Sequence, residues 1–572
     1  MQQINILLHT SFSQLSFIMK QVEIYCKNTN SVHEYPLGTS LLEISHDLDI
    51  KLENKVCGAI VNNQVRELSF CLVKPKRIEF FDFSHPDGRR LYIRSLIFVL
   101  YAAVKETFPE VTLKIQNGIS NGYFFELNGL GREITDSDIF TILQEMKSLI
   151  HQDIPFVKKR MQTAEVIELL RQQGLVDKAQ LFEQQGNLFS SLYFLKNLAN
   201  YFYGHLLPST GYILNFGLIS YFDGLLLQVP KPKNFDKLHK LVERKKLFGI
   251  FQEQKDWAEI LNVSTIGNLN NFTINNHSGD VLKISEALHE KKIAEIANMI
   301  HKLDGDLKIV LVSGPSASGK TTFSKRLGVQ LAVNGLRPYL ISLDDYFVDR
   351  ELTPIDEFGE YDFESIDAID IEFFNKQLLD LLDGREIELP GFDFQLGRRT
   401  ASGRKLKLLP ADILVVEGIH GMNPGLLTKI ERKYTFNIFI SALTQISFDE
   451  HSHISTADNR LLRRIIRDSK YRGYSASETI KRWPSVRRGE EKNIFPYQEN
   501  ADVMFNSATL YELAVLKKYA EPILKNVPEN REEYIEANRL LKFLSWFKQI
   551  DDSEIPPTSL LREFLGGSSF AY

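Results

Sequence analysis

The residues best suited to carry chemistry in this sequence are two glycines, a lysine and a threonine with the spacing Gly314-x4-Gly319-Lys320-Thr321. Glycines let backbone N–H groups turn inward around a phosphate group, and a helix starting there adds its positive end. The ammonium group of Lys320 is expected to neutralise phosphate oxygens, and the Thr321 hydroxyl is expected to ligate Mg²⁺. The spacing therefore predicts an ATP-phosphate site lined by Gly314, Ser316, Ser318, Gly319, Lys320, Thr321 and Thr322.

The segments on both sides of this loop have the pattern that such a site needs. The apolar run KIVLV at 308–312 predicts a buried parallel strand that leads into the loop. FSKRLGVQLAV at 323–333 has the spacing of a helix that leaves it. The strand, loop and helix in this order favour a nucleotide site over a glycine-rich turn without a ligand.

Acidic residues end two further apolar runs. PYLISLDDYF places Asp344 and Asp345 after a second predicted strand, and ADILVVEGI places Glu417 at the end of a third. Carboxylates at the C-terminal edge of a parallel sheet lie where ligands bind. We expect Asp344 to accept the proton of an acceptor hydroxyl, and Asp345 and Glu417 to serve Mg²⁺ or its waters. A solvated turn is the alternative for the aspartate pair.

Arginines recur at helical spacing in NRLLRRIIRDSKYRGY, residues 459–474. The intervening leucines and isoleucines are expected to point into the protein. Three interpretations stay open for the arginine face: a solvated basic surface, a lid that clamps the transferring phosphoryl group, or RNA binding. No aromatic platform accompanies these arginines, which weighs against RNA. The face comprises Arg460, Arg463, Arg464 and Arg467.

Together these stretches resemble the uridine kinase/phosphoribulokinase family of P-loop kinases over about residues 300–510. The resemblance implies an ATP- and Mg²⁺-dependent kinase, with Asp344 as the catalytic base and Glu417 as the acid associated with Mg²⁺. It also implies lid arginines at Arg464, Arg467 and Arg472. The matching stretches are GPSASGKTT, SLDDYF, YDFESIDAID, LPGFDF, ILVVEGI and RLLRRIIRDSKYRG.

The acceptor side departs from the family in several places. Glu364 falls where uridine kinases carry an aspartate that holds the ribose hydroxyls, so the acid is one methylene longer. Phe347 and Phe392 are expected to contact the acceptor, but uridine kinases have a tyrosine in place of Phe392 and a histidine in place of Gly397. Tyr474 replaces one lid arginine. Because lost hydrogen-bond partners remove discrimination, we expect phosphoryl transfer and leave pyrimidine specificity open.

The front of the chain reads as a different kind of protein. Residues 21–83 alternate apolar and polar positions, which predicts a small β-grasp-like α/β module, although a generic small domain has the same pattern. This module resembles a TGS domain, the ubiquitin-like module at the front of threonyl-tRNA synthetases. The matching stretches are VEIYCKNTNSVHEYPLGTSLLEI, GAIVNNQVREL and IEFF. The part of the chain that follows resembles the second additional domain of those synthetases, which edits mischarged tRNA. The matching stretches are IRSLIFVLYAAVKETFP, GISNGYFFEL and YGHLLPSTGYI.

The residues that would carry editing chemistry are replaced. The family's HxxxH pair falls on Arg94 and Phe98, and its later Cys and His fall near Phe202 and Leu206. None of these four side chains is a zinc ligand, so zinc is not expected. His205 lies one place away and is interpreted as structural. RNA binding by this half stays open.

Three other stretches carry structural predictions. The apolar segment Gly211–Pro230 is expected to form a hairpin, ISYF-Asp223-Gly224-LLLQV, with a type I′ turn at Asp-Gly. Residues 231–300 are charged with a helical rhythm and are expected to connect the two halves. The last 60 residues or so read as amphipathic helices, for which packing onto the kinase is favoured over a partner or dimer surface.

Composition excludes several classes of function. The formal net charge of −5 argues against wholesale coating of nucleic acid. The cysteines can form neither a disulfide framework nor a four-cysteine zinc site, so we expect a cytoplasmic protein with small buried thiols. No stretch is expected to span a membrane. The three cysteines are Cys26, Cys57 and Cys71.

The N-terminus has no signal-peptide pattern, because no basic residue precedes Lys20. A regular strand pattern begins only after Met19. Residues 1–18 are therefore expected to be an upstream extension, and the start codon, Met1 or Met19, stays open.

We expect a multidomain chain of α+β and α/β parts: a β-grasp module, an α+β domain similar to a synthetase editing domain, and a P-loop α/β kinase domain with a parallel sheet. The expected boundaries are 1–18 for the extension, 19–84 for the TGS-like module, 85–230 for the synthetase-like domain, 231–290 for the connector, 291–510 for the kinase domain and 511–572 for the C-terminal helices and tail.

The favoured function is transfer of phosphate from ATP to a hydroxyl group of a nucleoside-like small molecule. One alternative is a kinase for another small alcohol or a sugar phosphate. A different class of hypothesis is an RNA- or ribosome-associated regulator driven by ATP. Self-association stays open.

Overall fold

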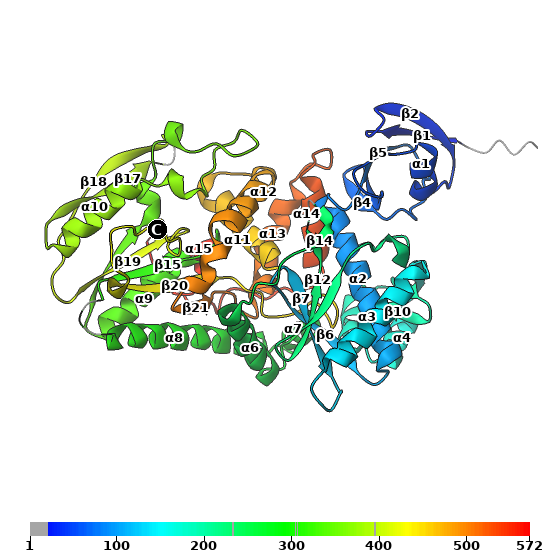
Figure 1. The fold of residues 1–572 in the computed structure, drawn as a ribbon, viewed down its shortest axis with the longest axis horizontal. Helices are drawn as coiled ribbons and strands as arrows, with labels where there is room; N and C mark the ends of the chain where they lie inside the picture. Colours follow the sequence, from blue (N-terminus) through cyan, green and yellow to red (C-terminus); the bar gives the residue numbers. More distant parts are fainter. Residues whose placement is uncertain (1–20, 232–233, 304, 306, 394–395, 572) are drawn as a thin grey trace, which may run out of the picture.

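The computed structural model describes residues 21–231, 234–303, 305, 307–393 and 396–571, so the predicted extension at 1–18 and Met19 lie outside the described residues. Figure 1 shows a small module at the front of the chain, a mixed domain that follows it, and a domain built on a parallel sheet. The predicted fold class, a multidomain chain of α+β and α/β parts, is confirmed.

The first module is a five-stranded sheet with the order β2-β1-β5-β3-β4 and one helix. Strand β1 pairs in parallel with β5, and Leu41 and Ile44 of the helix pack into the core of the sheet. This is the predicted β-grasp arrangement. Cys26 and Cys57 are buried here, whereas Cys71 is exposed. The elements are β1 Gln21–Cys26, β2 Ser31–Pro36, α1 Leu41–Asp47, β3 Gly58–Val61, β4 Gln64–Arg66 and β5 Lys76–Phe81.

The second domain is organised around α2, a 22-residue helix at Pro86–Thr107 whose apolar side chains are almost all buried. A four-stranded antiparallel sheet and a three-stranded sheet flank it. In the described part of the chain, neither α2 nor any other helix combines the length and apolarity needed to cross a membrane. The remaining elements are β6 Thr112–Ile119, β7 Gly122–Asn128, α3 Asp136–His151, β8 Val157–Gln162, α4 Thr163–Gln172, α5 Val176–Gln185, β9 Phe189–Leu195, β10 Leu198–Asn200, β11 Gly217–Tyr221 and β12 Gly224–Gln228.

The hairpin predicted in the most apolar segment is formed by β11 and β12, but its turn is displaced by one residue. Tyr221 pairs with Gly224, so the two loop residues are Phe222 and Asp223, and Phe222 has a φ of 50°. Gly224 is instead the first residue of β12, where a Cβ would lie 2.3 Å from the carbonyl oxygen of Phe125. The close approach of β7 explains the glycine and the shifted turn.

The connector is only partly helical. Residues 230–231 and 234–238 form a small antiparallel pair, β13 Pro230–Lys231 and β14 Asn234–Leu238. The helical rhythm predicted there is wrong because these residues pair as strands. Three helices follow: α6 Lys245–Ile260, α7 Ile266–Ile274 and α8 Ser278–Lys302. Helix α8 packs along the P-loop helix, and the boundary drawn between residues 290 and 291 falls inside it.

The P-loop domain has a five-stranded, fully parallel sheet with the order β16-β19-β15-β20-β21. The three apolar runs predicted to be parallel strands are β15 Ile309–Ser313, β16 Arg337–Ser342 and β19 Asp412–Gly418. The strands β20 Thr435–Ser441 and β21 Val503–Asn506 complete the sheet. Because β15 is central, its loop lies at the middle of the C-terminal edge.

Both faces of this sheet are covered. Alternate residues of β15 point to opposite sides: Val310 and Val312 pack against α8 and α9 Lys320–Val333, while Ile309 and Leu311 pack on the side of α10 Ile371–Leu382. A two-stranded arm, β17 Ile387–Asp393 with β18 Arg398–Leu406, extends beyond α10 (Figure 1).

The arginine-rich segment and the C-terminal helices share one apolar core. The C-terminal helices pack onto α11 of the kinase domain, as the favoured prediction had it, and they also pack onto the N-terminal half, where the rings of Phe182 and Trp546 lie 5.6 Å apart. The elements are α11 Thr456–Arg467, a π-helical turn at Asp468–Arg472, α12 Ala476–Asn493, α13 Glu512–Lys525, α14 Tyr534–Leu544 and α15 Arg562–Leu565.

The synthetase-like half binds the loop between β20 and α11 through a buried ion pair and a backbone hydrogen bond. The buried amine of Lys178 lies 2.9 Å from Oδ1 of Asp449 and 3.6 Å from Oε2 of Glu450. The Ile115 N–H donates to the carbonyl oxygen of Glu450 at 2.8 Å. Burial raises the pKa of Glu450 to about 7. The two halves are thus joined through the loop that leads into the arginine helix.

Candidate functional site

The P-loop connects the central strand β15 to α9 and wraps around the first turn of that helix. Ala317 has a φ of 59° and Gly319 a φ of 84°, so two peptide units turn to aim their N–H groups inward. A Cβ at Gly314 would lie 2.1 Å from the carbonyl oxygen of Ile440, so only glycine fits beside β20. The loop and the positive end of α9 together form an anion site.

Four of the predicted functional residues are gathered at this edge of the sheet. In the parallel register Ser342 lies opposite Glu417, so Asp344, two residues beyond β16, and Glu417 come to the same edge. Oγ1 of Thr321 donates to Oε1 of Glu417 at 3.0 Å. The ammonium group of Lys320 donates to the carbonyl oxygen of Pro315 at 3.2 Å. A hydroxyl, a lysine and two carboxylates therefore face the loop.

Electrostatics couples these groups. Burial raises the pKa of Glu417 to about 7, an effect that the positive charge of Lys320 opposes. Burial likewise lowers the pKa of Lys320, and the carboxylates of Glu417 and Asp344 oppose that shift. A carboxylate and a hydroxyl are hard oxygen donors, so Glu417 and Thr321 have the chemistry to hold Mg²⁺.

The serines of the loop have different surroundings. The Ser316 N–H donates to Oε1 of Glu490 at 3.0 Å, and its Oγ accepts from Arg464 at 2.9 Å. The hydroxyl of Ser318 is buried and has no hydrogen-bond partner within the described residues. Thr322 donates both its N–H and its hydroxyl to Glu563 of the C-terminal tail. Sequence reasoning did not anticipate Glu490 or Glu563 at the loop.

The three predicted lid arginines converge on one carboxylate. Arg464 and Arg467 each lie 3.3 Å from the carboxylate oxygens of Asp468, and Arg472 lies 3.5 Å from them. Burial lowers the pKa values of Arg464 and Arg472, and Asp468 opposes both shifts. The arginines are therefore assembled beside the P-loop, since Arg464 also reaches Ser316.

The other two arginines of the predicted face hold the structure together. Arg460 is fully buried and forms two hydrogen bonds with Glu490. Arg463 is also fully buried; it pairs with Glu512 and donates to the carbonyl oxygen of Ala317 at 3.4 Å. The interpretation of a solvated basic face is wrong, because α11 is packed on all sides. Both acidic partners lie more than 25 residues away in sequence, where spacing gives no signal.

The residues expected to bind the acceptor lie on loops and on the β17–β18 arm. Asp345, predicted to serve Mg²⁺, instead turns toward this arm, with Oδ2 3.2 Å from Arg404. Burial raises its pKa, and Arg404 opposes the shift. The rings of Phe347 and Phe392 lie 5.8 Å apart, centre to centre.

Glu364 has the most perturbed environment on the acceptor side. Burial raises its pKa to about 7, while Arg464 favours the ionised form and Glu490 disfavours it. It packs against Gly489 of α12, where a Cβ would lie 2.3 Å from the Cβ of Glu364. Gly397, at the place of the family's histidine, lies in the turn of the arm with a φ of 67°. Glu364 is therefore tightly packed against α12 and lies near the lid arginine Arg464.

The positions of the synthetase editing ligands form a packed interior. The rings of Phe98 and Phe202 lie 5.7 Å apart, and Leu206 is buried. The Arg94 guanidinium lies 5.0 Å from the ring centre of Tyr203. His205 lies 3.5 Å from Glu67 of the first module. These side chains join the two N-terminal domains.

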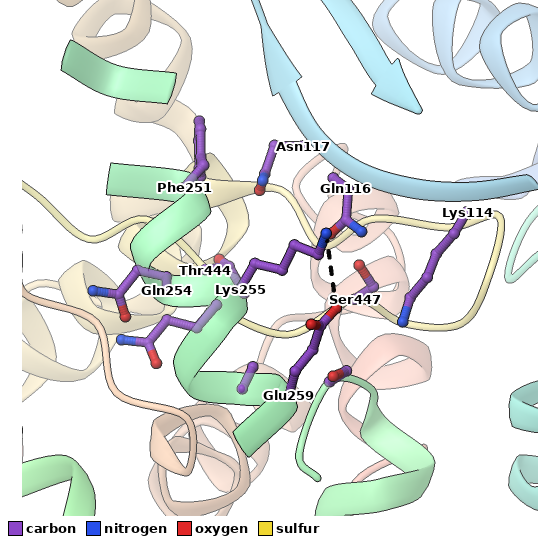
Figure 2. Close-up of a pocket in the computed structure, with 12 residues that line it drawn as sticks. Lys114, Gln116, Asn117, Phe251, Gln254, Lys255, Glu259, Thr444 and Ser447 are labelled. Atoms are coloured by element: carbon purple, nitrogen blue, oxygen red, sulfur yellow. Dashed lines mark ion pairs between the residues drawn. The ribbon is translucent and has the colours of Figure 1, made fainter. Parts of the chain in front are cut away.

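Figure 2 shows a hollow between the two halves, away from the P-loop. It is bordered by β6, α6 and the loop at residues 444–447, and Lys255 and Glu259, on successive turns of α6, lie 3.8 Å apart at its edge. Its polar lining carries no pair of groups suited to phosphate transfer. The chemistry of the chain is concentrated at the P-loop.

The C-terminal half of the chain is similar to a family of kinases. The profile of the "Phosphoribulokinase / Uridine kinase family" matches residues 309–514. The uridine kinase of Ligilactobacillus salivarius is 31% identical over 198 residues, which are 34% of this chain and 83% of that protein. A solved structure described as a possible uridine kinase from Bacillus stearothermophilus has a TM-score of 0.26 and 19% identity, covering 38% of this chain and 98% of that one.

The front of the chain is similar to a different protein. The threonine–tRNA ligase of Syntrophomonas wolfei is 30% identical over 182 residues, which are 32% of this chain. The chain spans only 28% of the length of that ligase. The two resemblances noted in the sequence, to a kinase family and to the N-terminal domains of a synthetase, are both confirmed.

Proposed function

This chain belongs to the phosphoribulokinase/uridine kinase family, and on that premise we propose that it transfers the γ-phosphoryl group of ATP to a hydroxyl group of a nucleoside, with Mg²⁺. The observation that carries the proposal is the meeting of Lys320, Thr321, Glu417 and Asp344 at one edge of the sheet, with Thr321 and Glu417 3.0 Å apart.

Each of these residues has a role that its chemistry supports. Lys320 and the N–H groups at the start of α9 hold the phosphates. Thr321 and Glu417 would hold Mg²⁺, which would neutralise charge on the phosphate oxygens. Asp344 takes the proton of the acceptor hydroxyl as that oxygen bonds to the γ-phosphorus and the bond to the bridging oxygen of ADP breaks.

The lid arginines supply positive charge for the same step. Asp468 gathers Arg464, Arg467 and Arg472, and Arg464 also donates to the hydroxyl of the loop serine Ser316. Charge on the transferring group spreads over its oxygens, and guanidinium groups that exclude water stabilise it. Substituting any one of the three is expected to lower kcat more than it raises KM for ATP.

A nucleoside is the acceptor that we favour. Glu364, at the place of the family's ribose-binding aspartate, is an acid beside the lid, and the Phe347 and Phe392 rings offer an apolar surface next to Asp345. Another small alcohol or a sugar phosphate is the alternative acceptor, because Phe392 and Gly397 replace the residues that read uracil in uridine kinases.

The experiment is to incubate the protein with Mg·ATP and a panel of nucleosides and sugar phosphates and to measure ADP release. Release stimulated by a nucleoside supports the proposal, and stimulation by sugar phosphates alone would replace the acceptor. Lys320→Ala is expected to lower the stimulated rate by about 100-fold or more with folding intact. A Lys320→Ala protein with the wild-type rate would refute the mechanism.

RNA binding by the N-terminal half is a second candidate function, favoured by the exposed edge strand β8. Lys159 lies 4.7 Å from the ring centre of Phe194, and the Arg160 guanidinium lies 5.2 Å from that of Phe189. Phe189 is itself half exposed. Basic side chains of the edge strand β8 that lie over aromatic rings of the neighbouring strand β9 fit a nucleic-acid backbone and its bases.

Binding of a tRNA to the full chain across a series of salt concentrations tests this second function. The Lys159→Glu/Arg160→Glu variant is expected to weaken binding and to reduce the salt slope, while Lys433→Glu in the kinase domain leaves both unchanged. Absence of binding at low salt would eliminate the function.

A further inference from the structure

The last segment of the chain folds back onto the P-loop. We call residues 553–571 the C-terminal tail; it includes the short helix α15. Figure 1 shows the C-terminal end beside the P-loop sheet. The amine of Lys325 on α9 donates to the carbonyl oxygen of Ala571. The tail thus lies against the helix that begins the nucleotide site.

One side chain of the tail reaches into that site. Oε2 of Glu563 accepts a hydrogen bond from the N–H of Thr322 at 3.2 Å and another from its hydroxyl at 2.7 Å. Thr322 is the third residue of α9, and N–H groups in the first turn of a helix have no acceptor within it. These N–H groups are the ones that a P-loop offers to nucleotide phosphates.

The charge of Glu563 acts on the centre of the site. Burial lowers the pKa of Lys320, and the Glu563 carboxylate opposes that shift, as do Glu417 and Asp344. The same carboxylate adds to the burial effect that raises the pKa of Glu417. Glu563 therefore places a negative charge where ATP would bring several more, and the two cannot share the site without repulsion.

Firm packing holds the tail in this position. Phe564 and Leu565 are buried in the apolar core that α11 shares with the C-terminal helices, and the Arg463 guanidinium lies 5.0 Å from the Phe564 ring centre. Arg562 donates to the carbonyl oxygens of Asp552 and Ile555, each at 2.8 Å. The backbone is thus anchored, while the Glu563 side chain projects to Thr322.

The tail also contacts the lid. The amine of Lys470, within the π-helical turn that carries Arg472, donates to the carbonyl oxygen of Leu565. A Cβ at Gly566 would lie 2.8 Å from the hydroxyl of Tyr471, so tail and lid touch closely here. A movement of the tail would therefore reach both the first turn of α9 and the lid.

We propose that the C-terminal tail is a built-in competitor of the nucleotide, in which the Glu563 carboxylate occupies the place of an ATP phosphate on Thr322 and leaves when ATP binds. The inference rests on the proposed function for the identity of the ligand. Glu563 is not a catalytic residue in this account: it sets how readily the site accepts ATP.

The test is the affinity of the full chain for ATP, measured by calorimetry without any acceptor, for the wild type and for Glu563→Ala and Glu563→Gln. Both variants are expected to bind ATP more tightly, Glu563→Ala by about 10-fold to 100-fold, because two hydrogen bonds to a charged group no longer compete. Glu554→Gln is the matched control, since Glu554 lies in the same tail but pairs with Lys283 at 3.0 Å. It is expected to bind ATP like the wild type.

Unchanged or weaker ATP binding by Glu563→Ala would overturn the inference; weaker binding would make Glu563 part of the nucleotide site. Tighter binding with no acceptor phosphorylated in the panel would leave the inference standing and refute the proposed reaction. No ATP binding by any of the proteins would refute both.

Hydrogen exchange tests the same inference without any substitution. Saturating ATP is expected to speed exchange of the backbone amides around Glu563 in the wild-type chain, because the loss of its two hydrogen bonds to Thr322 removes one of the contacts that hold the tail. Exchange in α13, whose apolar side chains belong to the same core, is the internal reference and is expected to stay constant. Exchange in the tail that ATP leaves unchanged or slows would contradict the proposal.

Discussion

Replacing Gly489 with alanine would press a methyl group against Glu364, the acid proposed to hold the acceptor. The added Cβ would lie 2.3 Å from Cβ and 2.9 Å from Cγ of Glu364. Carbon atoms in contact are about 3.5–4.0 Å apart, so one of the two segments must move by about 1 Å. Alanine is otherwise favoured over glycine inside a helix such as α12, so loss of helix propensity cannot explain a defect.

A displacement of this size in a positioning group can lower a rate by about 100-fold. We therefore expect kcat/KM for the acceptor that the panel identifies to fall by about 100-fold in Gly489→Ala, with the affinity for ATP unchanged. The assay is steady-state ADP release at saturating Mg·ATP with the acceptor concentration varied, together with calorimetry of ATP.

Gly249→Ala on α6 is the matched control, because nothing lies within 4 Å of the Cβ that it adds. It is expected to behave like the wild type. A folded Gly489→Ala protein with wild-type acceptor kinetics would show that the position of Glu364 is irrelevant to the acceptor and would refute its assigned role.

Two further predictions concern buried charges. As the pH rises from 4.5 to about 7, Glu364→Gln is expected to gain about 3 kcal/mol of stability relative to the wild type. In this pH window the folded wild type keeps a proton on Glu364 that the unfolded chain releases, so the wild type loses stability and the variant does not. A difference in unfolding free energy that stays constant with pH would contradict this prediction. Glu512→Ala leaves the Arg463 guanidinium buried without its partner, so it is expected to lower the free energy of unfolding in urea by about 3–5 kcal/mol. The double variant Arg463→Met/Glu512→Leu removes both charges and is expected to recover most of that loss. Equal losses in the two proteins would show that the unpaired charge is not the cause.

The kinase sheet was largely predictable from the sequence. Continuous apolar runs such as KIVLV and ADILVV identified three of its buried parallel strands, since a strand covered on both faces needs no polar alternation. In the folded sheet β19 lies next to β15, and this order brings Glu417, near the end of β19, beside Thr321 at the end of the P-loop. Short-range patterns thus located the P-loop and the acids that face it.

The partners of the arginines were not predictable. Helical spacing put Arg460, Arg463, Arg464 and Arg467 on one face but could not say which are buried. Glu490 and Glu512 follow them by 30 and 49 residues, and long-range pairs of this kind leave no periodic signal. Asp468 was adjacent in sequence, yet its role in gathering three arginines depends on the π-helical turn that follows α11.

The tail and the acceptor loops were the hardest parts to predict. Asp344 and Asp345 are neighbours in one turn, and the sequence cannot show that their side chains have different partners. In the fold, Arg404 of β18 pairs with Asp345. Glu563 lies 241 residues after Thr322, and nothing in its own segment indicates an anion site. Similarly, the hairpin turn moved by one residue because the backbone of β7 passes close to Gly224.

The central claim is tested most directly by following a labelled γ-phosphoryl group from ATP to a nucleoside and identifying the product. The account predicts a labelled nucleoside monophosphate with the wild-type chain and Mg²⁺, and about 100-fold less of it with Lys320→Ala. Label that appears only as inorganic phosphate, or equal transfer by the two proteins, would contradict it.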